Sequence, residues 1–71
     1  MKIDLLVAEI GSTTTVVNGF DGLDSCPRFI GQGQAPTTVL EGDVNAGLKA
    51  AIADLAKNIG EPIEYKELLA S

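Results

Sequence analysis

The chain contains no histidine and no tryptophan, and its only cysteine is Cys26. Without histidine, it cannot form a Ser-His-Asp or Cys-His nucleophile pair, nor the usual imidazole metal site. A single cysteine cannot form an internal disulfide, and we interpret Cys26 as an ordinary free thiol in a loop. Any chemistry in this chain must therefore come from carboxylates, hydroxyls and backbone amides.

Basic residues are also scarce. The chain has five lysines and arginines and ten aspartates and glutamates, which give it a net charge of -5. This balance opposes a nucleic-acid partner, whose affinity comes mainly from neutralised phosphates. No apolar run approaches the roughly 20 residues needed to cross a bilayer, which argues against a membrane partner. The start of the chain includes Asp4 and lacks the basic residues that open a signal peptide. We therefore expect a cytoplasmic protein.

The length and composition predict one small globular domain. The 71 residues are 45% hydrophobic with a mean hydropathy of +0.21, which is typical of a globular core. A domain of this size buries only about 60% of its unfolded surface. A large deep pocket is therefore not expected.

The first half of the sequence predicts three strands. Residues 3–10 are apolar on both faces except at Asp4 and Glu9, as is typical of a central strand covered on both sides. Residues 15–20 are rich in β-branched side chains and follow closely, which predicts an antiparallel hairpin with a turn at 11–14. A third strand over 28–35 is weakened by glycines and a proline, which suits the edge of a sheet.

The second half predicts helices. Apolar residues recur at helical spacing over 44–59, with Asp43 as a candidate N-cap and Gly60 after the last turn. Gly47 costs this helix roughly 1 kcal/mol relative to alanine unless close packing requires it. Asp54 is expected on the solvated helix face. Residues 63–70 are interpreted as the start of a second helix.

These elements give an α/β fold, of α+β character within this stretch: a three-stranded antiparallel meander followed by a helix. One helix covers one face of such a sheet, yet residues 3–10 are apolar on both faces. Either the chain dimerises, or residues 1–71 are the N-terminal part of an incomplete domain that later segments complete.

The turn between the first two strands is the strongest candidate site. Successive backbone N–H groups in a tight turn form a nest that binds anions such as phosphate. Gly11 permits close approach, and Ser12, Thr13 and Thr14 add hydroxyl donors. The carboxylate of Glu9 could hold a magnesium ion through its waters. The alternative is an ordinary hairpin turn whose hydroxyls satisfy their own backbone.

Other phosphate-binding motifs are absent from the sequence. The glycines at 31 and 33 imitate the start of G-x-G-x-x-G, but Pro36 stands at the third position and no helix begins there. No G-x-x-x-x-G-K-[ST] sequence occurs, which excludes a P-loop.

Residues 5–17, LLVAEIGSTTTVV, resemble the first phosphate-binding motif of the actin, heat-shock-chaperone and sugar-kinase superfamily. Residues 20–23, 28–38 and 40–44 are similar to the N-terminus of the glutamate mutase accessory proteins. The resemblance covers essentially the whole chain. Members of that family are several times longer, so it implies that this chain is their first part only.

The resemblance implies a ribonuclease-H-like fold whose later βαβ units extend the sheet and cover its other face. It also implies a full protein that binds magnesium ATP and reactivates an adenosylcobalamin-dependent mutase by exchanging damaged cobalamin. Gly11, Ser12, Thr13 and Thr14 would lie beneath the β- and γ-phosphates, with Glu9 near the magnesium. The expected partners are then the mutase, the nucleotide and the remainder of the protein's own chain.

Glu9 departs from the superfamily pattern, which usually has aspartate there. The longer side chain changes how a magnesium-bound water is held, so nucleotide binding is a firmer expectation than ATPase activity. The 71 residues lack the second phosphate loop and the adenosine pocket, and alone they should bind ATP poorly and be inactive. Two alternatives stay open: a small-molecule kinase of the same superfamily, and a self-contained dimerising interaction module with no nucleotide site.

Overall fold

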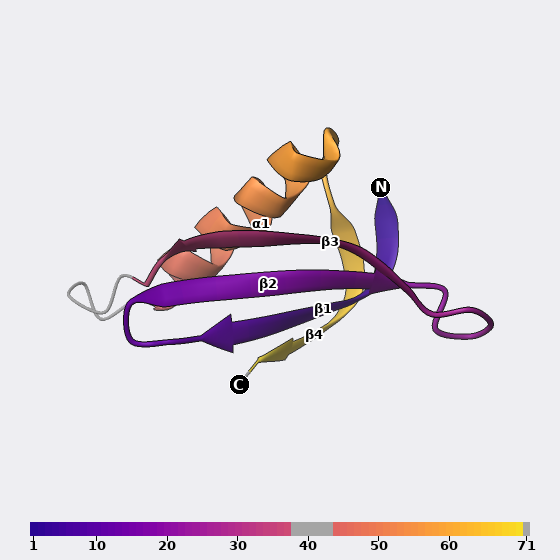
Figure 1. Cartoon of the computed structure of the whole chain (residues 1–71), viewed down its shortest axis with the longest axis horizontal. Coiled ribbons are helices and arrows are strands. Elements are labelled where there is room, and N and C mark those ends of the chain that lie inside the picture. Colours follow the sequence, from indigo (N-terminus) through magenta and orange to yellow (C-terminus); the bar gives the residue numbers. More distant parts are fainter. Residues whose placement is uncertain (38–43, 71) are drawn as a thin grey trace.

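The computed structural model describes residues 1–37 and 44–70. The chain forms a sheet with one helix packed against it, in an α+β arrangement (Figure 1). In chain order the elements are β1 (Lys2–Ile10), β2 (Thr14–Asp21), β3 (Arg28–Pro36), α1 (Val44–Ile59) and β4 (Glu64–Ala70). The three predicted strands and the predicted helix over 44–59 are confirmed. The proposed N-cap, Asp43, lies outside the described residues.

The sheet has the strand order β3-β2-β1-β4. β1 pairs antiparallel with β2, and β2 pairs antiparallel with β3, which is the predicted meander. β4 returns after α1 and pairs with the other side of β1 in parallel. β1 is therefore central and β3 lies at an edge, as the sequence predicted.

The prediction of a second helix over 63–70 is wrong, because Glu64–Ala70 forms strand β4. Glutamate, lysine, leucine and alanine all favour helices, and these residues dominate the segment. Beside β1, however, the segment forms a parallel ladder with register pairs from Lys2↔Glu64 to Ala8↔Ala70. Pairing along the free edge of a buried strand thus overrides local propensity.

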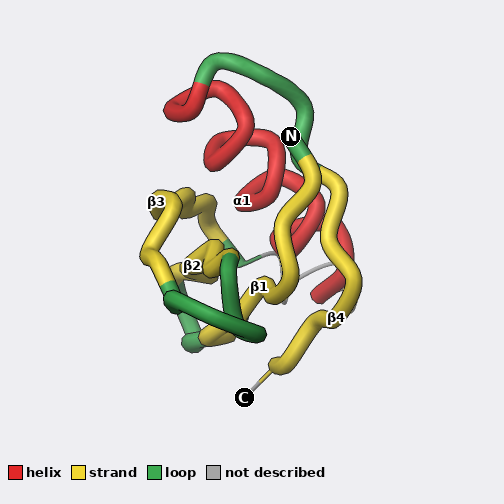
Figure 2. Tube along the Cα trace, turned by 90° about the vertical axis from the view of Figure 1, so that its right-hand side faces the viewer, coloured by secondary structure: helices red, strands yellow, loops and turns green. Residues whose placement is uncertain are grey.

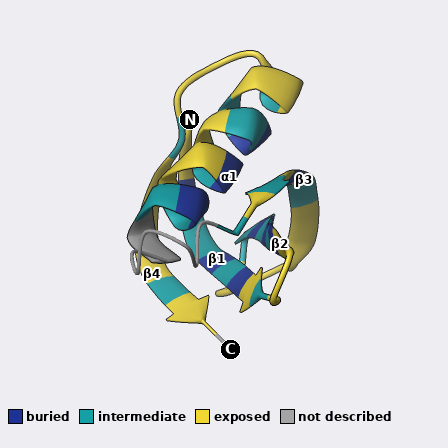
Figure 3. Ribbon diagram, turned by 90° about the vertical axis from the view of Figure 1, so that its left-hand side faces the viewer, coloured by how far each residue is buried: buried dark blue, intermediate teal, exposed yellow. Residues whose placement is uncertain are grey.

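The hydrophobic core lies between α1 and one face of the sheet (Figures 2 and 3). The helix contributes its apolar stripe, and the two central strands contribute the side chains that alternate toward it. No helix in the described ranges is long and apolar enough to span a membrane. The fully buried apolar residues of this core are Ile3, Leu6, Ala8, Val17, Ala51 and Leu55.

α1 approaches β3 closely because β3 presents glycine to it. A Cβ at Gly33 would lie 2.3 Å from both the carbonyl oxygen of Ala51 and the amide nitrogen of Leu55. A Cβ at Gly31 would meet only side-chain atoms, the nearest being Leu55 Cδ1 at 3.3 Å. Gly33, one of the glycines expected only to weaken this strand, therefore makes room for the helix backbone.

Two α1 side chains cover the outer edge of β3. Asp54 Oδ2 accepts a hydrogen bond from the Gln34 backbone N–H at 3.0 Å, and Asn58 Nδ2 donates to the Gln32 carbonyl oxygen at 2.9 Å. An open strand edge invites pairing with another chain, and these contacts occupy part of it. Asp54, expected on the solvated helix face, is half-buried and makes its hydrogen bond at an exposed place.

The opposite face of the sheet is covered by no described element (Figure 2). Its side chains alternate with those of the core, and its apolar members are only partly buried or exposed, such as Leu69 at 54% exposure. We call this surface the open face. Its apolar residues include Leu5, Val7, Val16, Phe20 and Leu69.

Candidate functional site

The predicted turn joins β1 to β2 at one end of the sheet (Figure 1). The Gly11 N–H donates to the Thr14 carbonyl oxygen at 2.9 Å and closes the hairpin over Ser12 and Thr13. All four residues are exposed. Because the Gly11 amide is used within the turn, a ligand would have to be met by other donors of the turn, among them the hydroxyls of Ser12, Thr13 and Thr14.

The turn has an unusual backbone for a short hairpin. Such connections favour positive φ, yet among the described residues only two glycines, Gly22 and Gly60, have it. Ser12 and Thr13 therefore keep negative φ, as residues with a Cβ prefer. Contacts from elsewhere in the chain also reach this turn.

Thr37 provides those contacts, from the residue just after β3. Its backbone N–H donates to the Thr13 carbonyl oxygen at 3.0 Å, and its hydroxyl lies 2.8 Å from that of the fully buried Thr15. The start of α1 packs against the same place, since a Cβ at Gly47 would lie 3.0 Å from the Pro36 carbonyl oxygen. Close packing therefore explains Gly47, and Thr37 and the start of α1 support the turn from one side.

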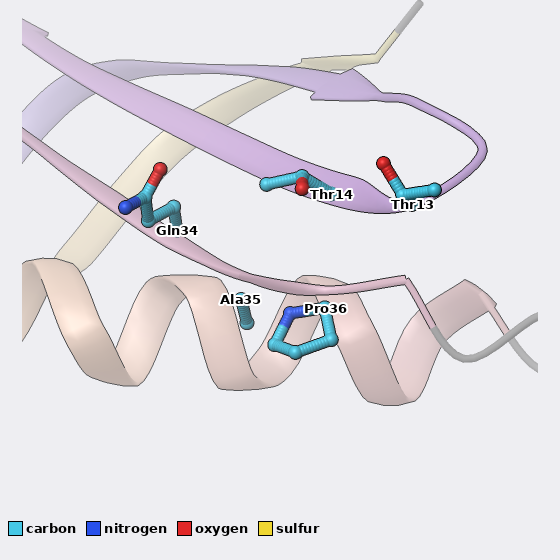
Figure 4. A pocket seen from close by; sticks show the side chains of 5 residues that line it. All are labelled: Thr13, Thr14, Gln34, Ala35 and Pro36. Atoms are coloured by element: carbon cyan, nitrogen blue, oxygen red, sulfur yellow. The ribbon is translucent and has the colours of Figure 1, made fainter.

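An open hollow of about 330 Å³ lies beside the turn (Figure 4). Gln34 points away from α1, toward the side on which Thr13 and Thr14 lie, and Ala35 points toward the helix. None of the lining side chains is charged, and the volume is at the lower end for small-molecule sites. The residues that line the hollow are Thr13, Thr14, Gln34, Ala35 and Pro36.

The strand register places Glu9 in line with this hollow. Glu9 pairs with Val16, and Val16 pairs with Gln34, so these three residues form one row across β1, β2 and β3. Paired residues point to the same face of a sheet, which here is the open face. Glu9 and Gln34 are both exposed and flank Val16.

Glu9 suits a magnesium ion that keeps most of its water. Magnesium is held by oxygen ligands and is commonly bound through only one or two carboxylates together with substrate phosphates. The described residues contain no group of three or more His, Cys, Asp or Glu side chains that could hold a metal. The water-mediated role of Glu9 therefore stays a prediction that rests on this one carboxylate two residues before the turn.

Sequence reasoning named the turn and Glu9 but missed Gln34, Thr37 and Thr15. For Gln34 the available signal was the alternation of side chains along a strand. Gln34 pairs with Val16, which pairs with Glu9, so the three side chains share one face of the sheet. A polar β-branched residue two positions before the buried Val17 was the signal for Thr15. Thr37 offered none, because its contacts depend on where β3 ends.

A second polar cluster lies around Asp4, apart from the turn. Asp4 Oδ2 accepts a hydrogen bond from the Leu23 N–H at 3.0 Å, and Lys66 Nζ lies 3.5 Å from Oδ1. The Leu23 amide, followed by the Lys66 ammonium, holds the pKa of the Asp4 carboxyl below its usual range. This cluster fastens the β2–β3 loop, in which Cys26 is an exposed free thiol.

Comparison with known proteins gives one family. The family model described as MutL protein matches residues 5–71, which include the turn, all of β2, β3, α1 and β4, and most of β1. No curated protein and no solved structure matches the chain.

Proposed function

We propose, from the premise that the chain belongs to the MutL protein family, that it is the ATP-binding N-terminal part of a reactivating chaperone for an adenosylcobalamin-dependent mutase. This is the family of glutamate mutase accessory proteins that the sequence resembles. The proposal places the nucleotide phosphates at the turn 11–14, in a domain completed by further parts of the protein.

The observation that carries the proposal is the turn at the end of β1, which is held by hydrogen bonds between Thr37 and both Thr13 and Thr15. Its exposed amides and hydroxyls lie together, while its other side is fastened by Thr37 and the start of α1. Groups that are fixed before a ligand arrives lose little entropy on binding it.

Among the described residues, no side chain that lines the hollow could neutralise a phosphate, and we assign this role to a metal ion. The residues lining the hollow are uncharged, so the chain brings no lysine or arginine to the phosphates there. When bound, magnesium would supply the positive charge that the phosphates require. Glu9 would orient the ion by accepting hydrogen bonds from its water ligands.

The experiment that tests this function is reactivation of an inactivated glutamate-mutase-type enzyme by the longest natural form of this protein. With magnesium ATP, activity is expected to return when intact adenosylcobalamin is supplied. Glu9→Ala should reduce reactivation and magnesium-dependent ATP affinity by about tenfold while preserving the fold. Glu64→Ala, which removes an exposed glutamate at the start of β4, is the matched control.

Three results would contradict parts of this proposal. Unchanged ATP affinity in Glu9→Ala would remove Glu9 from the metal site. Failure of the wild-type protein to reactivate the mutase would contradict the chaperone role. Transfer of phosphate from ATP to an added small-molecule acceptor would instead favour a kinase.

A further inference from the structure

We propose that Gln34 is a phosphate-binding residue of the same site, its side-chain amide donating a hydrogen bond to a phosphate oxygen of the nucleotide held at the turn. This inference rests on the proposed function. It adds a residue of β3 to a site whose sequence-based candidates, Glu9 and residues 11–14, all lie in or next to β1 and β2.

The position of Gln34 is the first argument. It lines the hollow together with Thr13 and Thr14, and Figure 4 shows its side chain directed away from α1, toward the side on which these two residues lie. A phosphate resting on the turn and extending into the hollow would come between these hydroxyls and the amide. Gln34 also shares its cross-strand row with Glu9, so the two side chains would flank the ligand.

The free side chain of Gln34 is the second argument. Within residues 1–37 and 44–70, no hydrogen bond engages its amide, whereas the amide of Gln32 on the same strand donates to Asn18 Oδ1 at 2.9 Å. The Gln34 backbone is nevertheless fixed, because its N–H donates to Asp54 and its strand pairs with β2. A free donor on a fixed strand is already placed to meet a ligand.

The chemistry of the carboxamide is the third argument. It offers two N–H donors and one acceptor without adding charge. The donors suit a phosphate oxygen, and the acceptor suits a water of the magnesium ion. A glutamate of the same shape would keep only acceptors and add a negative charge beside the phosphates.

This difference gives a test by isothermal titration of magnesium ATP into the longest natural form of the protein. Gln34→Glu is expected to raise the Kd at least about tenfold, because it replaces a donor to a charged group with a like charge. Gln34→Ala should raise it less, by about fivefold. Gln32→Glu and Gln32→Ala, on the same strand and the same face, should change it less than twofold.

A salt series and thermal melting separate the possible causes. The excess effect of Gln34→Glu over Gln34→Ala should shrink as salt screens the repulsion, and the melting temperatures of all four variants should stay close to that of the wild type.

If the wild type binds ATP and the Gln34 variants bind it equally well, the Gln34 assignment fails and the ATP site stands. If changes at Gln32 are as damaging, a general effect of β3 replaces a contact at Gln34. If the wild type does not bind magnesium ATP, both proposals fail.

Discussion

At the scale of single residues, two groups of small side chains set the geometry of the candidate site. Gly33 lets α1 lie against β3, and Gly47 lets the start of the helix lie against Pro36 and Thr15. A hydrogen bond between the hydroxyls of Thr15 and Thr37 then ties the residue after β3 to the start of β2 beside the turn. The geometry of the candidate site therefore depends on the lack of a Cβ at Gly33 and Gly47 as well as on the hydrogen bond between Thr15 and Thr37.

Gly33→Ala should lower the free energy of unfolding by about 3 kcal/mol, because the new Cβ would meet helix backbone that cannot move aside alone. Gly31→Ala on the same strand should cost less than about 1 kcal/mol, since its Cβ would meet only the movable ends of Leu55 and Ile59. Urea unfolding of the two variants measures this difference. Equal losses would show that the helix does not approach β3 at Gly33 as described.

At the scale of elements, β3 is an edge strand, and side chains of α1 hydrogen-bond part of its free backbone edge. Asp54→Ala should remove the acceptor of the Gln34 N–H, so amide hydrogen exchange at Gln34 should become at least about tenfold faster. Asp54→Asn keeps an acceptor oxygen of similar shape and should preserve most of the protection. Protection that survives Asp54→Ala would show that the Gln34 amide is held by another group.

The β2–β3 loop is expected to loosen in acid, because it is fastened by the Asp4 carboxylate. A carboxyl group whose pKa is lowered by folding stabilises the folded state above its unfolded pKa and loses this effect as the pH falls through its folded pKa. The Leu23 amide resonance should therefore shift with a midpoint below the ordinary value of 3.8. Asp4→Asn should remove this titration, and a midpoint at or above 3.8 would contradict the contact.

The sequence predicted the local elements better than the long-range ones. The hairpin, the edge strand and the helix over 44–59 follow from β-branched runs, glycines and helical spacing, all of which are local signals. β4 could not be found in this way, because its residues favour a helix and become a strand only beside β1. The turn was recognisable from its composition. Its base at Thr37 and the position of Gln34 were not, because both depend on how β2 and β3 are paired.

At the scale of the whole molecule, a four-stranded sheet has a helix on one face and the open face on the other. That a second copy or a further part of the protein covers the open face stays a prediction. The open face carries apolar side chains such as Leu5 and Leu69, and the row of Glu9, Val16 and Gln34 lies on it beside the candidate site. A ligand at the turn would therefore lie at the margin of the open face.

The isolated 71-residue chain should bind an apolar fluorescent dye at the open face. Leu69→Lys should weaken this binding about threefold or more, because Leu69 lies on that face and is 54% exposed. Leu23→Lys changes a leucine of similar exposure in the β2–β3 loop and serves as the control. An equal effect of the two changes would show that the dye does not report the open face.

The measurement that tests the central claim most directly is a titration of magnesium ATP into the longest natural form of the protein while the backbone amide resonances of residues 11–15 are followed. If the turn is a phosphate site, these resonances should shift together and saturate, with the isolated 71 residues responding weakly. If the protein is folded and none of these amides moves in either form, the turn only connects β1 to β2 and the nucleotide site at this position is refuted.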